Sequence, residues 1–325
     1  MHEDPAMAPV LVANAGSSSL KIRIFGPKDE TLFSGIAAEI GGRSRLVLGR
    51  AETTMPLSDH ATALDALLDA ATSGGVDARS IGAAAHRIVH GGPDLTASAE
   101  LTPPVLARAR DAATLAPLHN PPALAVIAAV ARTRPGLRQI ACFDTAFHAT
   151  IPEVGWRYAL PDLPETRGIR RYGFHGLSYA SLAARLPAAT GGPLPRRLLA
   201  AHLGNGASLC AIRDGRSVAT TMGYSPLGGL TMGTRTGEID GNAVLEIARR
   251  AGIDRASDIL NRESGLKGLG GASDMRALQA AGTPGAAFAV DHFIHWAVHH
   301  AGAMVADMGG IDALVFTGGI GENAA

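Results

Sequence analysis

Short apolar runs alternate along the chain with longer segments in which apolar residues recur every three or four positions. This alternation is typical of an α/β protein. Ser58 or Asp59 is placed to cap the first helix, and prolines begin the next two. We predict several short strands within residues 10–50, single strands at 81–89 and 138–143, and helices at 59–72, 103–116 and 121–132.

An irregular stretch with several prolines and glycines runs from about residue 148 to 176. Long connections of this kind are usually functional or disordered. A chain of 325 residues suggests about two domains. We therefore place the boundary at the start of this stretch, and expect an N-terminal domain at 1–147 and a C-terminal domain at 148–325.

An apolar run, a small polar turn and a second apolar run occur in the same order twice. Pro9–Ile24 and Arg197–Ile212 align with a slip of about one residue. Chance similarity between two hairpins is one explanation, because short apolar runs are common. The other is a pair of similar domains, each offering a phosphate-binding turn, that hold a nucleotide between them.

Composition excludes several classes of partner. Formal net charge is zero, with 18% charged and 4% aromatic residues, so no basic or base-stacking surface for nucleic acid or anionic lipid is indicated. The acidic N-terminus has no apolar core of a signal peptide, and the longest apolar stretch, 123–131, is too short to span a bilayer. We expect a cytoplasmic protein in which Cys142 and Cys210 are buried free thiols.

The clearest candidate phosphate site is the turn Asn14–Lys21. It reads NAGSSSLK and lies between two apolar runs, so its backbone N–H groups and the hydroxyls of Ser17 and Ser19 gather at a hairpin tip. Lys21 is a rare lysine in a chain that otherwise uses arginine, and a compact ammonium there favours a contact with phosphate. An ordinary serine-rich β-turn is the alternative.

Two charged residues lie near the ends of predicted strands. Asp144 directly follows the strand at 138–143, where α/β proteins often place residues that bind ligands or metals. Arg87 is a fixed cation beside the Gly91–Gly92 turn. A turn-capping aspartate and a surface arginine are the alternatives. His86 and His90 are four residues apart, but the β-branched residues between them favour a strand, in which that spacing does not indicate metal.

Three further clusters, at 170–176, 231–240 and 317–323, set polar residues among glycines, which implies close approach of the backbone to a ligand. In the last cluster Gly319, Gly321 and Ala324 mimic a dinucleotide fingerprint. We expect no helix after them and reject that interpretation. A glycine loop after a buried strand fits the sugar and base of a nucleotide better. A P-loop is excluded because the chain has no Gly-Lys dipeptide.

Three histidines, His292, His295 and His299, fall on one face of a predicted helix near the C-terminus. Zinc is conceivable there, but no carboxylate or thiol partner is evident. We expect these rings to pack on the core.

Taken together, these clusters resemble the acetate and propionate kinase family of the sugar kinase/Hsp70/actin superfamily. The matching stretches follow the family's order and cover nearly the whole chain. They are NAGSSSLK (14–21), HRIVHGG (86–92), APLHNP (116–121), FDTAFH (143–148), RRYGFHG (170–176), HLGNGAS (202–208), MGTRTGEID (232–240), SDMR (273–276) and FTGGIGEN (316–323).

The resemblance implies an α/β fold of two similar lobes of the ribonuclease H-like type, with a nucleotide cleft between them. It also implies roles for individual residues. The catalytic residues would be Asp144, His175 and Arg235, and Asn14 would bind the metal. Arg87 would bind the substrate carboxylate, and the walls around the alkyl end of the substrate would be Val89, Leu118, Phe174 and Pro226. The residues that would hold ATP are Ser17, Ser19, Lys21, His202, Leu203, Gly204, Asn205, Gly206, Asp274, Met275, Arg276, Gly318, Gly319, Ile320, Gly321, Glu322 and Asn323.

The implied reaction is reversible, direct in-line transfer of the γ-phosphoryl group of ATP to acetate, with Mg²⁺ or Mn²⁺. A carboxylate is already a nucleophile at pH 7, so we expect Asp144 to orient an arginine or a metal-bound water rather than to remove a proton. The alternatives are a kinase for propionate or another short-chain carboxylate, and a nucleotide-binding module without turnover. A homodimer is implied, and neither nucleic acid nor a membrane is an expected partner.

One departure from the family's pattern concerns the end of the chain. In the family, several dozen residues follow the GGIGEN loop, return to the first lobe and supply a glutamate that binds Mg²⁺. Here Ala324 and Ala325 follow that loop. We therefore expect this chain to lack the C-terminal segment and one metal ligand, which leaves its own turnover open.

Overall fold

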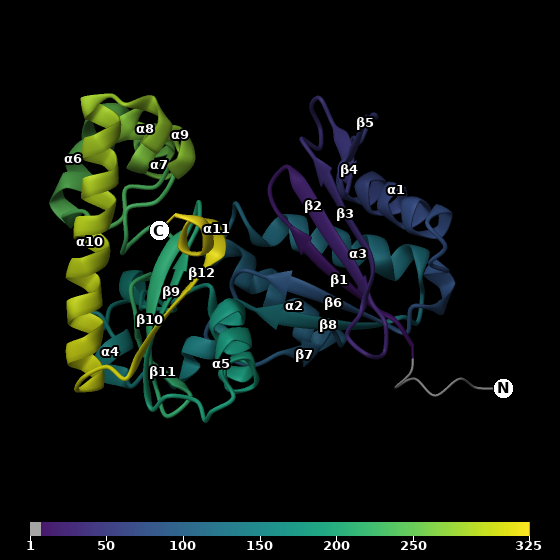
Figure 1. Cartoon of the computed structure of the whole chain (residues 1–325), viewed down its shortest axis with the longest axis horizontal. Coiled ribbons are helices and arrows are strands. Elements are labelled where there is room, and N and C mark those ends of the chain that lie inside the picture. The colour runs from purple at the N-terminus through teal and green to yellow at the C-terminus, as the bar shows by residue number, and fades with distance from the viewer. Residues whose placement is uncertain (1–7, 325) are drawn as a thin grey trace. The chain divides into compact units, whose positions relative to one another are not determined.

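The computed structural model describes residues 8–324. It divides into two compact units, of which the first ends at Ala146 and the second begins at Phe147 (Figure 1). Over the described residues, no helix combines the length and the apolar character needed to cross a membrane.

The first unit is built on an eight-stranded sheet with the strand order β5-β4-β3-β2-β1-β6-β8-β7. Its central strands β1, β6 and β8 run parallel to one another, whereas the remaining neighbours pair antiparallel. The strands are β1 (Val10–Ala15), β2 (Ser19–Phe25), β3 (Thr31–Ala38), β4 (Arg45–Leu48), β5 (Ala51–Thr54), β6 (Ala83–Ile88), β7 (Ala99–Glu100) and β8 (Arg138–Phe143).

Among the described residues, three α-helices complete this unit: α1 (His60–Ser73), α2 (Pro103–Asp111) and α3 (Asn120–Thr133). The predicted cap of α1 is confirmed, since the Asp59 carboxylate accepts a hydrogen bond from the Thr62 N–H. The apolar residues of α1 and α3 pack with those of β1, β2 and β6 in one continuous core. Strand β2 alternates strictly: the side chains of Leu20, Ile22 and Ile24 are buried, while those between them are exposed.

The second unit repeats the centre of the first sheet on a smaller scale. Its strands are β9 (Arg197–Leu203), β10 (Ala207–Arg213), β11 (Arg216–Thr220) and β12 (Ala313–Thr317), in the order β11-β10-β9-β12. The β9–β10 hairpin is antiparallel and β12 runs parallel to β9, just as the β1–β2 hairpin is antiparallel and β6 runs parallel to β1. The hairpin repeat seen in the sequence is therefore a structural repeat.

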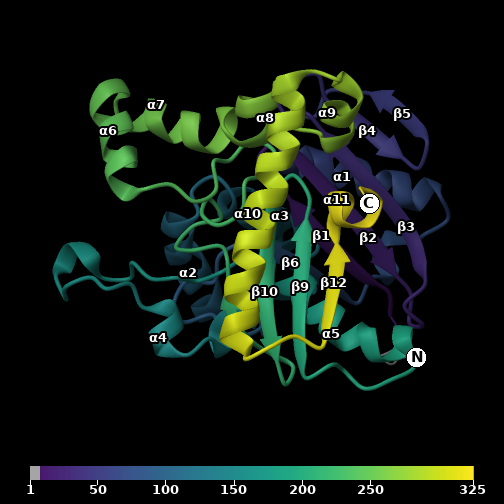
Figure 2. The same cartoon turned by 60° about the vertical axis from the view of Figure 1, so that its left-hand side comes forward.

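Helices lie on both faces of the second sheet. Helix α5 packs Tyr179 against Leu198 and Cys210 on one face. Helix α10 lies across β10 on the other, and Figure 2 shows it crossing in front of that strand. The helices of this unit are α4 (Glu153–Trp156), α5 (Gly176–Thr190), α6 (Gly241–Ala251), α7 (Ile253–Asp258), α8 (Gly265–Gly270), α9 (Met275–Ala281), α10 (Pro284–Met308) and α11 (Gly318–Asn323), with a π-helical turn at Ile259–Glu263.

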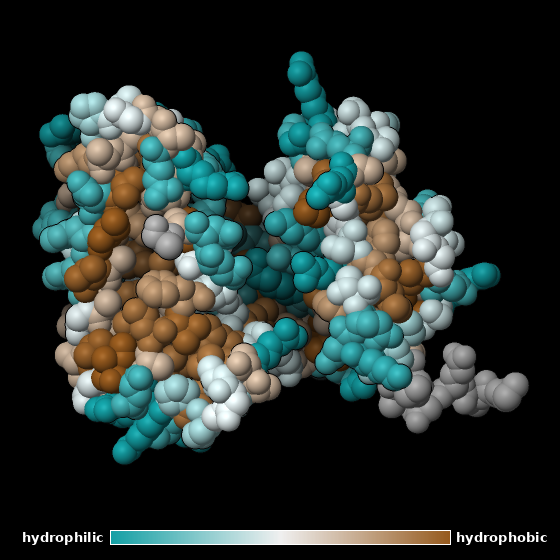
Figure 3. Space-filling model, in the orientation of Figure 1, coloured by the Kyte–Doolittle hydropathy of each residue, from teal (hydrophilic) through white to brown (hydrophobic). Residues whose placement is uncertain are grey.

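The end of the described chain differs from the sequence prediction in two respects. A short helix, α11, includes the glycines themselves, so the expectation of a glycine loop directly after β12 is wrong. Strand β12 is not buried either, because it is the edge strand and α10 lies over β10 rather than over β12. Phe316 keeps 52% of its surface exposed, and Figure 3 shows hydrophobic surface on this unit.

Two other expectations about burial are wrong. His295 and His299 on α10 are exposed and stack on each other, with ring centroids 6.5 Å apart, instead of packing on the core. Cys210 is buried as expected, but Cys142 is only half-buried. Both cysteines are free thiols. Between residues 8 and 324, no group of three or more His, Cys, Asp or Glu side chains is placed to hold a metal ion.

Candidate active site

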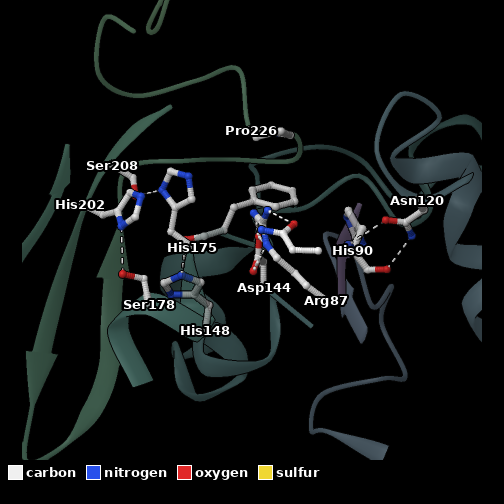
Figure 4. Close-up of polar contacts among 12 residues, drawn as sticks. Arg87, His90, Asn120, Asp144, His148, His175, Ser178, His202, Ser208 and Pro226 are labelled. Atoms are coloured by element: carbon white, nitrogen blue, oxygen red, sulfur yellow. Dashed lines mark hydrogen bonds and ion pairs between the residues drawn. The ribbon is translucent and has the colours of Figure 1, made fainter. Parts of the chain in front are cut away.

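The first unit holds Arg87 against two acceptors at the ends of its parallel strands (Figure 4). The Arg87 guanidinium donates to Asp144 through Nε, 3.1 Å from both Oδ1 and Oδ2, and through Nη2, 2.5 Å from Oδ2. Its Nη1 donates to the Asn14 Oδ1 at 3.1 Å. Bidentate, charge-assisted contacts of this kind fix the plane of the guanidinium as well as its position.

Sheet topology explains this meeting of three distant residues. Arg87 lies on β6, next to β8, and Asp144 follows the last residue of β8. Asn14 lies near the end of β1, on the other side of β6. Parallel strands bring their carboxyl ends to one edge, so side chains from all three meet there. Burial disfavours the Arg87 cation, but the charge of Asp144 and its hydrogen bonds outweigh this effect and raise the pKa of Arg87.

The predicted phosphate turn connects β1 to β2. Asn14 pairs with Lys21 across this hairpin, and Lys21 is exposed. The Gly16 N–H donates to the Ser19 carbonyl at 2.8 Å, which closes the turn, and the Gly16 carbonyl lies 2.7 Å from the His60 Nε2. Ser17 is exposed at the tip, and Ser19 is half-buried as the first residue of β2. The Ser17 hydroxyl and the Lys21 ammonium are thus accessible to an anionic ligand.

A second polar pair fixes the chain just beyond Arg87. The His90 N–H donates to the Asn120 Oδ1 at 3.1 Å, and the Asn120 Nδ2 donates back to the His90 carbonyl at 2.9 Å (Figure 4). Both residues are fully buried. The pair joins the backbone beyond β6 to the start of α3, near two predicted wall residues, the buried Val89 and the exposed Leu118. Sequence reasoning assigned no role to Asn120, although it lies within the APLHNP stretch.

His86 precedes Arg87 on β6 and, by strand alternation, is directed to the opposite face. It is 1% exposed, and neither ring nitrogen makes a hydrogen bond of acceptable distance and angle within residues 8–324, although the Gln139 side chain lies near enough to favour the charged ring. Burial lowers the pKa of His86 from 6.5 to about 4, because the imidazolium cannot be hydrated there. His86 is therefore neutral in the folded protein at pH 7.

This shift predicts a component of acid lability. Because the pKa of His86 is lower in the folded than in the unfolded chain, the unfolded state takes up a proton first as the pH falls. The contribution of His86 to the free energy of unfolding is fully present above pH 6.5 and is lost as the pH falls to about 4. At 1.36 kcal/mol per pKa unit, this loss amounts to about 3 kcal/mol in total. We expect His86→Leu to unfold in urea with a smaller stability loss between pH 7.5 and pH 5 than the wild type. Equal losses in the two proteins would contradict this assignment.

In the second unit His175 lies at the start of α5, in a left-handed conformation with φ of 60°. Residues other than glycine seldom adopt it, and at a functional site such strain is usually held by neighbours. Here the neighbour is His148, whose Nε2 lies 2.9 Å from the carbonyl of the preceding residue, Phe174. The carbonyl can only accept, so His148 carries its proton on Nε2 and accepts from the Ser217 hydroxyl at Nδ1, 2.8 Å away. Burial lowers the pKa of His148 to about 4, which keeps this ring neutral. Sequence reasoning assigned no role to His148.

The loop between β9 and β10 brings His175 and Arg235 together. A Cβ atom placed on Gly206 would lie 3.3 Å from the His175 Nε2 and 3.7 Å from the Arg235 Nη1. Such a Cβ atom would press on the His175 ring and meet the Arg235 Nη1 at ordinary van der Waals distance, so both groups lie close to this loop. The Arg235 Nη1 donates to the carbonyl of Pro226 at 3.1 Å, which anchors the guanidinium. The His202 Nδ1 lies 2.9 Å from the Ser178 hydroxyl, and its ring centroid is 4.2 Å from that of His175.

A pocket of about 310 Å³ lies beside this loop. The Asp274 carboxylate caps α9 by accepting from the Ala277 N–H, and this hydrogen bond lowers the pKa of Asp274. Several predicted ATP residues do not line the pocket: His202, Leu203, Gly206, Gly318, Gly321 and Glu322. Glu322 instead accepts from the Gly318 N–H and the Thr317 hydroxyl. The pocket is lined by Gly204, Asn205, Ser273, Asp274, Met275, Arg276, Gly319, Ile320, Asn323 and Ala324, of which Ser273 and Ala324 were not predicted.

Solved structures give the class of this fold. The acetate kinase of Porphyromonas gingivalis is 36% identical with a TM-score of 0.88, and the comparison covers 97% of this chain and 84% of that one. A propionate kinase from Francisella tularensis is 34% identical with a TM-score of 0.91, covering 98% and 85%. The fold is therefore the α/β fold of the sugar kinase/Hsp70/actin type, as the sequence predicts.

Sequence comparison specifies the family. A sequence model of the acetokinase family matches residues 9–325. The acetate kinase of Nitrobacter hamburgensis is 43% identical over 333 residues, which span 98% of this chain and 82% of that protein, and the acetate kinase of Leifsonia xyli is 42% identical over a similar span. The chain belongs to the acetokinase family.

Proposed function

We propose that this protein is an acetate kinase, which transfers the γ-phosphoryl group of ATP to acetate and gives acetyl phosphate and ADP, reversibly. The observation that carries the proposal is the guanidinium of Arg87, held by the buried Asp144 at the carboxyl ends of parallel strands. A planar cation fixed in this way suits a small carboxylate substrate. The family and the names of the relatives support the same reaction.

Transfer to a carboxylate needs no general base. The acid is ionised at pH 7, so one of its oxygens attacks the γ-phosphorus while the bond from that phosphorus to the bridging oxygen of ADP breaks. No proton moves in this step. Asp144, whose two oxygens both accept from Arg87, therefore acts as the residue that orients the arginine.

The difficulty of the reaction is the approach of an anion to a polyanion, and cationic or N–H groups reduce it. Arg87 binds the acid, with Val89, Leu118, Phe174 and Pro226 as the walls for its methyl group. In the second unit His175, Arg235 and Asn205 donate to the transferring phosphoryl group. Lys21, with Ser17 and Ser19, contacts the nucleotide phosphates. The pocket beside Gly204 and Asp274 takes the adenosine.

Asn14 and Asp144 fit a magnesium ion on chemical grounds. Their oxygens already accept from Arg87, and amide and carboxylate oxygens each have capacity for a further contact. Mg²⁺ in kinases uses one or two such ligands together with water and substrate phosphates. When bound, Mg²⁺ or Mn²⁺ supplies positive charge that offsets the triphosphate. We further infer a cytoplasmic homodimer, as the family resemblance implies.

The proposal predicts a specific product. With ATP, Mg²⁺ and acetate, the protein should form acetyl phosphate that hydroxylamine traps as the hydroxamate. Across formate, acetate, propionate and butyrate we expect kcat/KM to be highest for acetate. One additional methylene should change kcat/KM by about 10- to 200-fold. A maximum at propionate would instead support a propionate kinase, to which the Francisella tularensis structure gives weight. ATP binding without any hydroxamate would support a nucleotide-binding module.

A further inference from the structure

A chain of hydrogen bonds leads from the core of the second unit to His175. The Tyr179 hydroxyl, on α5, lies 2.8 Å from the Ser208 carbonyl and 2.5 Å from the Ser208 Oγ. The Ser208 Oγ, on β10, lies 2.8 Å from the Nδ1 of His175 (Figure 4). Both Tyr179 and Ser208 are fully buried. Neither has a role in the reaction as described above.

The protons of this chain can be assigned by counting donors. A carbonyl only accepts, so the bond to the Ser208 carbonyl uses the single proton of the Tyr179 hydroxyl. The bond between the two hydroxyls must then use the Ser208 proton, with Tyr179 as acceptor. Ser208 has no proton left for His175, so Nδ1 of His175 must donate to it. With one proton for each hydrogen bond, only this arrangement satisfies all three contacts. Burial raises the pKa of Tyr179 well above 10, so its hydroxyl keeps the proton.

We propose that Tyr179, acting through Ser208, is a positioning residue that keeps the proton of His175 on Nδ1. This inference rests on the proposed role of His175 toward the phosphoryl group. With Nδ1 protonated, the neutral ring presents only a lone pair at Nε2, and it can donate from Nε2 only as the imidazolium. The network therefore makes hydrogen-bond donation from the Nε2 of His175 depend on pH. A neutral ring protonated at Nε2 could donate at any pH.

The surroundings of His175 determine when it is charged. From β9 the ring of His202 lies 4.2 Å away between centroids, and Arg235 approaches from the loop 221–240 beside Gly206. From β10 the neutral hydroxyl of Ser208 contacts the Nδ1 of His175, and Tyr179 on α5 contacts that hydroxyl in turn. Of these neighbours, Arg235 carries a fixed positive charge, which disfavours a second cation on His175. The transferring phosphoryl group would thus supply the negative charge that favours the imidazolium.

The tautomer can be measured without turnover. In protein labelled with ¹⁵N-histidine, long-range ¹H–¹⁵N spectra distinguish Nδ1–H from Nε2–H, and His175→Gln identifies the signal. We expect the neutral ring of the wild type to carry its proton on Nδ1. In Tyr179→Phe the Ser208 proton is released to bind Nδ1, so the ring should change to Nε2–H. Ser208→Ala removes the acceptor of Nδ1 and should act in the same direction, which keeps the test open if one variant folds poorly.

Tyr172→Phe is the matched control. It removes another buried tyrosine hydroxyl of the same unit, one that donates to the Gly168 carbonyl at 3.0 Å. We expect it to leave the tautomer of His175 unchanged. A wild-type ring protonated on Nε2, or the same spectral change in Tyr172→Phe and Tyr179→Phe, would overturn the proposal. This readout is independent of the reaction, so the assignment can fail while the proposed function stands, or the reverse.

The pH profile gives a second measure. In the wild type, kcat should fall as the pH rises and the imidazolium of His175 is lost. In Tyr179→Phe the neutral ring keeps a donor at Nε2, so the ratio of variant to wild-type kcat should rise about tenfold for each pH unit on that limb. The ratio for Tyr172→Phe should stay constant. A constant ratio for Tyr179→Phe would mean that its hydroxyl serves only the fold.

Discussion

Replacing Arg87 with alanine is expected to raise the KM for acetate by at least about a hundredfold, because a bidentate contact between a guanidinium and a carboxylate is worth about 3 kcal/mol or more. The KM for ATP should change little. Initial rates at varied acetate and varied ATP measure the two constants. If only the affinity for ATP fell, Arg87 would be assigned to the wrong substrate.

The same substitution should also destabilise the first unit. The side chain of Asp144 is 3% exposed, and the hydrogen bonds that the structure describes for its carboxylate all come from Arg87. Removing one member of a buried ion pair costs about 3–5 kcal/mol because the other charge remains unpaired. The double variant Arg87→Ala/Asp144→Ala is the control. It should regain most of the stability lost in Arg87→Ala, measured by urea unfolding, and remain inactive, which separates loss of binding from loss of fold.

Much of the fold could be predicted because its signals are local. The alternation of β2, the cap of α1 at Asp59 and the prolines that begin α2 and α3 each depend on a few neighbouring residues. The position of Asp144 at the end of β8 follows from the same reasoning. These features act on the local backbone whatever fold the rest of the chain adopts. They can therefore be recognised in a single sequence.

Contacts between distant side chains could not be predicted in this way. The bond from His148 to the Phe174 carbonyl joins residues 26 apart, and the bond from Tyr179 to Ser208 joins residues 29 apart. Neither pair has a spacing that marks it in the sequence. The exposure of β12 depends likewise on the path of α10 over the neighbouring strands, which apolar periodicity does not specify.

The loop that carries Arg235 depends on close packing at a distant glycine. Gly265, the first residue of α8, has φ of +64°, and a Cβ atom there would lie 2.1 Å from the Met232 carbonyl oxygen and 2.6 Å from that of Arg235. These are backbone atoms, so no side chain can move aside. A backbone hydrogen bond from the Leu266 N–H to the Met232 carbonyl joins α8 to this loop, and another, from the Met232 N–H to the Arg235 carbonyl, closes the loop itself.

Gly265→Ala is therefore expected to displace Arg235 and lower kcat by about a hundredfold, since a shift near 1 Å at a transition-state contact has that effect. Gly271→Ala is the matched control. Gly271 ends the same helix with φ of +84°, but a Cβ atom there would have no neighbour within 4 Å among the described residues. Both variants carry the cost of a left-handed alanine, about 1–2 kcal/mol. Only Gly265→Ala adds the collision with the Met232 and Arg235 carbonyls. If kcat for Gly271→Ala stays within a few-fold of the wild type, the loss of kcat in Gly265→Ala is due to the packing of the Arg235 loop. Similar losses in the two variants would show that backbone strain alone is responsible and that this packing does not position the arginine.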